Sequence, residues 1–139
     1  MNASPKNPLI EVRGITKRFT GVRALHDVDL QVDTGEVLAV LGENGAGKST
    51  LMKILAGILE PDCGEIRLDG QSVRIDSVRT AEQYGIALIH QELNLATNLD
   101  LGGNIFLGRE PHWMGVIRRQ KIDRDSARVL RQVGLRESP

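Results

Sequence analysis

The sequence contains a glycine-rich stretch, Gly42-Glu43-Asn44-Gly45-Ala46-Gly47-Lys48-Ser49-Thr50, which matches the pattern G-x-x-x-x-G-K-S. This pattern is the Walker A motif, a loop whose backbone amides surround phosphate groups. Its glycines permit positive φ angles and leave no Cβ between the backbone and a phosphate. The helix expected after the loop adds the positive end of its dipole. The stretch therefore predicts a phosphate-binding site.

The residues on both sides of this loop support the prediction. Before it, Val37-Leu38-Ala39-Val40-Leu41 forms an unbroken apolar run, which is typical of a buried parallel strand. After it, Leu51, Ile54, Leu55 and Ile58 recur at the spacing of one helix face. Strand, glycine-rich loop and helix, in this order, is the context in which the motif binds a nucleotide.

Each polar residue of the motif has an expected role. Lys48 should reach the β and γ phosphates of a nucleotide, and the Ser49 hydroxyl should ligate Mg²⁺. Thr50 is placed for a further phosphate contact. The residues predicted to line the site in this loop are Gly42, Glu43, Asn44, Gly45, Ala46, Gly47, Lys48, Ser49 and Thr50.

Composition narrows the possible classes of protein. The 139 residues suffice for one modest domain with a core. The chain has 18 Lys and Arg against 18 Asp and Glu, so no global field attracts nucleic acid or anionic lipid. Cys63 is the only cysteine, which excludes an internal disulfide and a multi-cysteine metal site. No signal-peptide pattern or bilayer-length apolar run occurs, so we expect membrane association only through a partner.

Local patterns predict the remaining elements. Asp69-Gly70 between two alternating runs predicts a β-hairpin, and the pattern from Leu9 to Ile15 predicts a strand followed by a turn at residues 17–21. Ser77 is the expected N-cap of a helix that ends before Gly85. Further expected elements are a half-buried strand at 28–32, a buried strand at 86–89, and helices at 101–107 and 123–133, the last with Ala127, Leu130 and Val133 facing inward.

These elements and four stretches resemble one known family. The stretches are Glu11 to Phe19, Gly42 to Thr50, His90-Gln91-Glu92-Leu93 and Asn104-Ile105-Phe106-Leu107-Gly108-Arg109-Glu110. Together they are similar to the ATP-binding proteins of ABC transporters, and specifically of bacterial monosaccharide importers of the ribose, galactose and xylose type. The resemblance covers nearly everything from Leu9 to Leu135. It implies an α/β fold, the P-loop NTPase of the ABC ATPase type, with an antiparallel β subdomain and the start of a helical subdomain.

The composition of residues 1–8, which is rich in polar residues and proline, and the resemblance together imply a domain organisation. Residues 1–8 are expected to be a disordered lead-in. Residues 9–99 are expected to form the N-terminal part of the nucleotide-binding domain. Residues 100–139 are expected to begin an incomplete helical subdomain.

Two further site residues follow from the resemblance. Phe19 matches the aromatic residue that stacks on adenine, although a phenylalanine at a strand end can also belong to the core. Gln91 matches the glutamine that senses Mg²⁺ and the γ-phosphate, although it can also be an ordinary polar loop residue. Glu92 and the residues to Asn98 would then face the transport subunit. The implied cofactors are ATP and Mg²⁺.

The implied partners are transmembrane permease subunits and a second nucleotide-binding domain, with no nucleic acid. The implied location is the cytoplasm, peripheral to the inner face of the plasma membrane through the permease. Which sugar is carried does not follow from this chain, because a binding protein and the permease select it.

Several motifs of this family are not found in the sequence. These are a Leu-Ser-Gly-Gly-Gln-like motif, an apolar strand that ends in a Mg²⁺-binding aspartate with the adjacent catalytic glutamate, and a later histidine. Leu101-Gly102-Gly103-Asn104 resembles the first of them but lacks the serine and the glutamine and lies too early. No catalytic residue can therefore be named. We expect a truncated, N-terminal fragment that binds ATP and does not hydrolyse it alone.

Other classes of function are weaker. One alternative is a non-catalytic nucleotide-binding remnant. Another is a soluble ABC ATPase without a transport partner, against which the importer-like stretch from Asn104 to Glu110 argues. A GTPase fits poorly because no Asn-Lys-x-Asp motif is present to recognise guanine.

Overall fold

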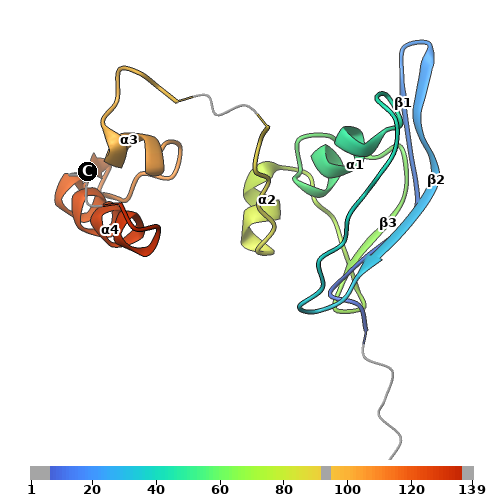
Figure 1. The fold of residues 1–139 in the computed structure, drawn as a ribbon, viewed down its shortest axis with the longest axis horizontal. Helices are drawn as coiled ribbons and strands as arrows, with labels where there is room; N and C mark the ends of the chain where they lie inside the picture. The colour runs from blue at the N-terminus through green and yellow to red at the C-terminus, as the bar shows by residue number, and fades with distance from the viewer. Residues whose placement is uncertain (1–6, 92–94, 136–139) are drawn as a thin grey trace, which may run out of the picture. The chain divides into compact units, whose positions relative to one another are not determined.

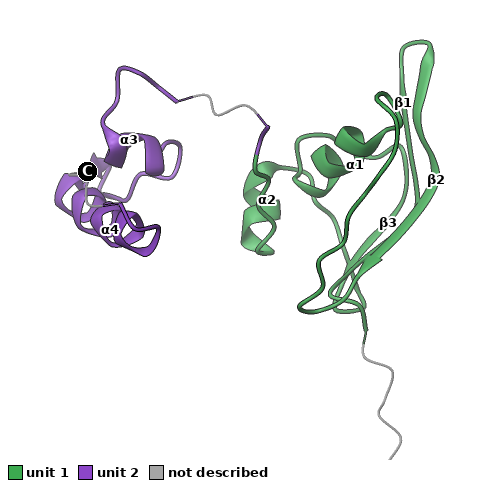
Figure 2. Ribbon diagram, viewed as in Figure 1, with its two compact units in different colours: residues 1–89 green, residues 90–139 purple. Residues whose placement is uncertain are grey.

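The structure is a computed structural model, and it describes residues 7–91 and 95–135. The chain divides into two compact units, residues 1–89 and residues 90–139 (Figure 2). Each unit has its own secondary structure and packing. The expected lead-in at 1–8 falls largely outside the described residues, as does the part of the expected transporter-facing segment at 92–94.

The first unit is built on a four-stranded antiparallel sheet. Its strands are β1 (Ile10–Phe19), β2 (Val22–Val32), β3 (Cys63–Leu68) and β4 (Gln71–Val73). They lie side by side in the order β2-β1-β3-β4, of which β1, β2 and β3 are labelled in Figure 1. The β3–β4 turn is Asp69-Gly70, with both residues at positive φ, so the predicted hairpin is confirmed.

The β1–β2 hairpin extends further than the sequence predicted. A turn was expected from Lys17 to Gly21, but pairing continues to Phe19 and Val22, and only Thr20 and Gly21 form the turn. The register shifts twice between Ile15 and Arg18, and each shift places an extra residue in β2, which marks bulges in that strand. Lys17 and Arg18 do not continue the apolar alternation of the sequence, and it is their pairing with Leu25 and Arg23 of β2 that continues the strand.

Two helices accompany the sheet. Helix α1 (Lys48–Leu55) buries Leu51, Ile54 and Leu55. These side chains join one hydrophobic core with residues of the sheet, Val12, Ile15, Leu25 and Ile66. Helix α2 (Val78–Gln83) begins at Ser77, whose hydroxyl accepts a hydrogen bond of 3.1 Å from the Thr80 amide. Both helices lie where the sequence predicted them.

The two predicted buried strands are wrong. Neither Val37–Leu41 nor Ile86–Ile89 is a strand, and the side chains of Val37, Leu41 and Ile89 are 96%, 89% and 88% exposed. A parallel strand exists only through hydrogen bonds to neighbouring strands. No strand of the described ranges, 7–91 and 95–135, pairs with either segment. The apolar composition was recognised correctly, but composition alone does not supply the neighbours.

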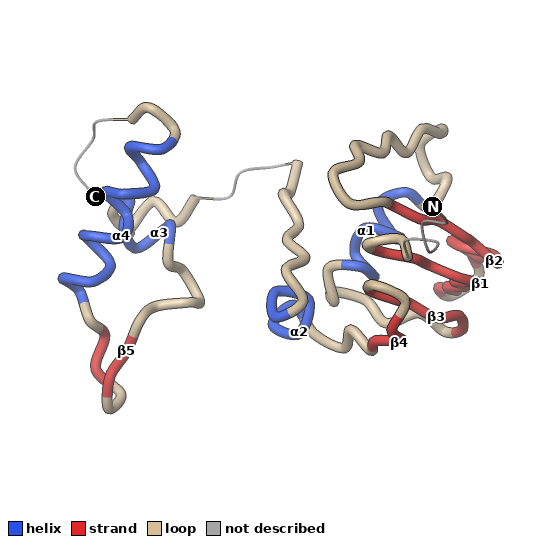
Figure 3. The backbone as a smooth tube through the Cα atoms, turned by 90° about the horizontal axis from the view of Figure 1, so that it is seen from below, coloured by secondary structure: helices blue, strands red, loops and turns tan. Residues whose placement is uncertain are grey.

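The second unit is mainly helical. It contains α3 (Leu101–Ile105), a short hairpin of β5 (His112–Trp113) and β6 (Val116–Ile117), and α4 (Arg119–Gln132) (Figure 3). Helix α4 begins four residues earlier than expected and buries Ile122, Ser126 and Leu130. Of the predicted inner residues, Leu130 is buried, Ala127 is half-buried, and Val133 is 67% exposed. The inner face is therefore rotated toward Ile122 and Ser126.

Glycine allows α3 and α4 to approach closely. A Cβ on Gly102 would lie 2.9 Å from Ile122 Cγ2. Asp100 caps α3 by accepting a hydrogen bond of 2.7 Å from the Gly103 amide. Asn104 then fixes the preceding loop, since its side chain accepts from the Ala96 amide at 2.8 Å and donates to the Ala96 carbonyl at 3.1 Å.

Candidate nucleotide-binding site

The Walker A loop leads directly into α1. The Ala46 amide donates to the Glu43 carbonyl at 3.2 Å, which closes a turn inside the loop. Gly47 is the N-cap of α1 and has a φ of 88°, a left-handed conformation that favours glycine. Because glycine has no side chain, it caps none of the first amides of the helix. Those amides, with the helix dipole, remain available to an anion.

The side chain of Lys48 is hydrogen-bonded to the first two residues of the Walker A loop. Its Nζ donates to the Gly42 carbonyl at 2.6 Å and to the Glu43 carbonyl at 2.7 Å. A Cβ built on Gly42 would lie 3.4 Å from the Ala46 Cβ and 3.9 Å from this Nζ, both ordinary van der Waals distances. The loop therefore presents a fixed positive charge next to the free amides of a helix, which suits a phosphate.

Gly47 joins the loop to the sheet. It is buried, and a Cβ there would approach the Ala24 carbonyl to 2.3 Å and Leu25 Cδ2 to 2.7 Å. Leu25 is paired with Lys17 of β1. The loop therefore packs against the same part of the β1–β2 hairpin that leads, two residues later, to Phe19.

Phe19 lies at the end of β1, next to the hairpin turn. Its side chain is 45% exposed and is not part of the hydrophobic core. Lys17 Nζ lies 5.9 Å from the centre of the ring, within the range of a cation–π contact. An exposed aromatic face on this hairpin is suited to stacking against a flat base.

Asp62 anchors this end of β1. One carboxylate oxygen accepts from Lys17 Nζ at 2.8 Å, and the other accepts from the Arg18 amide at 2.7 Å. The Asp62 amide donates to the Thr16 carbonyl at 2.9 Å. The hydrogen bond from Lys17 and that from the Arg18 amide lower the pKa of Asp62. Sequence reasoning missed Asp62, because its partners are 44 and 45 residues away and no local motif marks it.

The predicted magnesium ligands lie in different units. Ser49 is exposed in the first turn of α1, and Thr50 beside it is half-buried. Gln91 is exposed and belongs to the second unit, so its role at the metal stays a prediction. Within residues 7–91 and 95–135, no cluster of three histidine, cysteine or acidic side chains could hold a metal ion. The Ser49 hydroxyl is an oxygen donor of the type that Mg²⁺ takes together with nucleotide phosphates.

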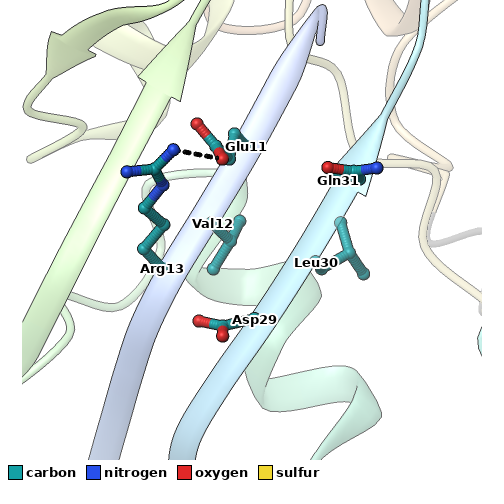
Figure 4. A pocket seen from close by; sticks show the side chains of 6 residues that line it. All are labelled: Glu11, Val12, Arg13, Asp29, Leu30 and Gln31. Atoms are coloured by element: carbon teal, nitrogen blue, oxygen red, sulfur yellow. Dashed lines mark ion pairs between the residues drawn. The ribbon is translucent and has the colours of Figure 1, made fainter.

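A separate shallow pocket lies on the β1–β2 ladder (Figure 4). Glu11, Arg13, Asp29 and Gln31 line it with Val12 and Leu30. Arg13 pairs with Glu11 at 2.7 Å, which raises the pKa of Arg13, and Asp29 accepts from the Gly14 amide at 2.7 Å. Because the charged groups Glu11, Arg13 and Asp29 already bind one another or the backbone, we interpret this pocket as a solvated face of the sheet.

The chain is similar to known sugar-import proteins. It is 54% identical over 129 residues to a ribose import ATP-binding protein of Caldanaerobacter subterraneus subsp. tengcongensis, covering 92% of this chain and 26% of that protein. It is 51% identical to another from Rubrobacter xylanophilus, covering 95% of this chain and 26% of the relative. The chain thus spans about a quarter of the length of these relatives.

Solved structures show the same fold. The ATP-binding cassette MJ1267 of an ABC transporter matches with a TM-score of 0.76 at 21% identity, covering 93% of this chain and 55% of that one. A nucleotide-free cassette of an ABC transporter matches with a TM-score of 0.69 at 23% identity, covering 93% and 56% of the two chains. In the described part of this chain, no helix has the length and apolar character needed to cross a membrane.

The family model described as ABC transporter matches residues 25–139, which include the whole Walker A loop and α1. Together with the fold neighbours, this match assigns the P-loop NTPase fold of the ABC ATPase type to the chain. The antiparallel sheet and the helices of this chain form part of that domain. The chain belongs to the ABC transporter family.

Proposed function

We propose that this chain binds ATP with Mg²⁺ through its Walker A loop, as part of the energising subunit of a bacterial sugar importer. The observation that carries the proposal is the position of Lys48, hydrogen-bonded to the Gly42 and Glu43 carbonyls at the uncapped start of α1. The similarity to ribose import ATP-binding proteins supports the sugar class of the transporter.

Different residues would bind the phosphates, the metal ion and the base of the nucleotide. The amides of the loop and Lys48 would bind the phosphates, and Ser49 would ligate the metal ion that ATP brings. Magnesium supplies charge neutralisation at the phosphates. Phe19 would stack on adenine, because its ring is exposed at the hairpin end next to which the loop packs. Gln91 would sense the metal and the γ-phosphate.

Transport and hydrolysis belong to the larger assembly in this proposal. Permease subunits in the membrane would receive the energy, and a second nucleotide-binding domain would complete the site. The chain would therefore work at the cytoplasmic side of the membrane through its permease. ATP hydrolysis also needs a base and a positioned water, and no residue of this chain is assigned as that base.

Isothermal titration calorimetry with MgATP tests the binding site. We expect Lys48→Ala to weaken binding by about a hundredfold or more, since it removes a charge-assisted contact to two phosphates. Lys53→Ala is the matched control, because Lys53 is an exposed lysine of the same helix, and it should bind like wild type. Equal affinity of the wild type and Lys48→Ala would refute the site.

Phosphate release measured on the same samples tests the catalytic part. We expect no ATP turnover above the buffer rate from this chain alone. Turnover that Lys48→Ala abolishes would show that the chain contains a complete hydrolytic site.

A further inference from the structure

Asp62 lies at the point where β1 loses one of its two neighbours. Strand β3 pairs with β1 only as far as Thr16 opposite Cys63. Beyond this point β1 continues through Lys17 and Arg18 to Phe19, paired on one side only, with β2. A strand end with one open side, whose remaining partner β2 carries two bulges at this point, is free to bend unless another group holds it.

The side chain of Asp62 takes the place of the missing neighbour. Its backbone amide donates to the Thr16 carbonyl at 2.9 Å, and its carboxylate accepts from the Arg18 amide at 2.7 Å. One residue thus bonds β1 on both sides of Lys17, as the next residues of a paired strand would. The last residue held in this way directly precedes Phe19.

The other carboxylate oxygen fixes a charge beside the ring. Lys17 Nζ lies 2.8 Å from Asp62 Oδ1 and 5.9 Å from the centre of the Phe19 ring. The Lys17 side chain is only 17% exposed, so its ammonium is held in place more firmly than that of a typical surface lysine. Asp62 therefore acts on Phe19 through the backbone at Arg18 and through the ammonium of Lys17.

We propose that Asp62 is a positioning residue that sets the Phe19 ring for stacking against the base of the nucleotide. The proposal rests on the proposed function, because it requires that Phe19 meets a base. Binding of the base and binding of the phosphates should therefore depend on different residues. Asp62 should matter for the base, whereas the phosphates depend on the Walker A loop and not on Asp62.

Two ligands distinguish binding of the base from binding of the phosphates, MgATP and inorganic tripolyphosphate with Mg²⁺, each titrated into the full chain by calorimetry. We expect Asp62→Ala to weaken MgATP by about threefold to tenfold, the range of one aromatic stacking contact, and to leave tripolyphosphate unchanged. Asp62→Asn keeps an acceptor for the Arg18 amide but loses the charge, so its effect should be smaller. Glu60→Gln is the control. Glu60 lies close to Asp62 in the sequence, and the substitution neutralises an exposed carboxylate whose ion pair with Arg74 is long, at 3.4 Å.

A double-mutant cycle with Phe19→Ala separates positioning from general damage to the fold. If Asp62 acts through Phe19, adding Asp62→Ala to Phe19→Ala should not weaken MgATP further. Additive losses, or equal weakening of both ligands, would overturn the proposal and leave Asp62 with a structural role. Unchanged MgATP affinity in Asp62→Ala would also overturn it, with the proposed function intact. A wild-type chain that binds neither ligand would refute the proposed function, and this proposal with it.

Discussion

Gly47 is important for the shape of the binding site, although it has no side chain that could contact a ligand. A Cβ there would meet the Ala24 carbonyl at 2.3 Å, and backbone atoms of a paired strand cannot move aside as a flexible side chain does. We expect Gly47→Ala to abolish MgATP binding and to destabilise the first unit by about 2–3 kcal/mol. Urea unfolding and calorimetry measure the two effects.

Gly35→Ala is the matched control for this substitution. Gly35 has a φ of 80°, close to that of Gly47, but no atom lies within 4 Å of a Cβ built on it. It should cost about 1 kcal/mol from backbone strain and leave MgATP binding unchanged. If both alanine variants behave alike, the left-handed backbone and not the contact with Ala24 limits position 47.

Individual residues also show what could be predicted from sequence. The positions of Gly47 and Lys48 before and at the start of a helix follow from the Walker A spacing, because the motif, loop and helix are contiguous. Asp62 could not be predicted, because its role arises only when the fold brings it to Lys17 and Arg18. The exposure of Phe19 required the structure as well, since a phenylalanine at a strand end can equally be buried.

At the scale of elements, prediction succeeded where the backbone hydrogen bonds are formed locally and failed where they would come from distant strands. The Asp69-Gly70 turn and the helix capped by Ser77 satisfy their backbone groups locally, and both were predicted. The segments at 37–41 and 86–89 would take their bonds from distant strands, and in the described residues they form no strand. The β5–β6 hairpin was missed because its strands have only two residues each, too few for a periodic pattern.

The packing of α3 on α4 gives a prediction in which two effects oppose each other. Gly102→Ala should gain about 1 kcal/mol from helix propensity but should lose more from the 2.9 Å approach to Ile122 Cγ2. We expect a net destabilisation of the second unit by about 1 kcal/mol. Thermal unfolding followed by the fluorescence of Trp113, the only tryptophan, reports on this unit.

A second substitution tests the cause of this effect. Leucine has no methyl group at the Cγ2 position, so Ile122→Leu added to Gly102→Ala should restore part of the lost stability. A stabilising effect of Gly102→Ala alone would show that α4 moves aside at little cost.

At the scale of the whole molecule, the notable feature is exposed apolar surface on a loop. Val37 and Leu41 are 96% and 89% exposed in a segment whose composition is that of a strand. Such segments pair readily with other chains. We therefore expect the isolated chain to self-associate as its concentration rises, as sedimentation velocity would measure, and Val37→Lys to reduce this association.

Met114→Lys provides the control for this prediction. Met114 is 85% exposed but lies in the turn between β5 and β6, with a φ of 49° and not in a segment of strand-like composition. The same added charge should have little effect there. Equal suppression by both variants would mean that net charge, and not strand pairing, governs the association.

The two carbonyl hydrogen bonds of Lys48 have a consequence for the kinetics of capture. Lysine ordinarily loses much side-chain entropy when it is immobilised on a ligand. Here the loop has already restricted this side chain through the Gly42 and Glu43 carbonyls. The ammonium of Lys48 is therefore already positioned when a nucleotide binds. Affinity differences among variants of the Walker A loop should appear mainly in the dissociation rate of the nucleotide.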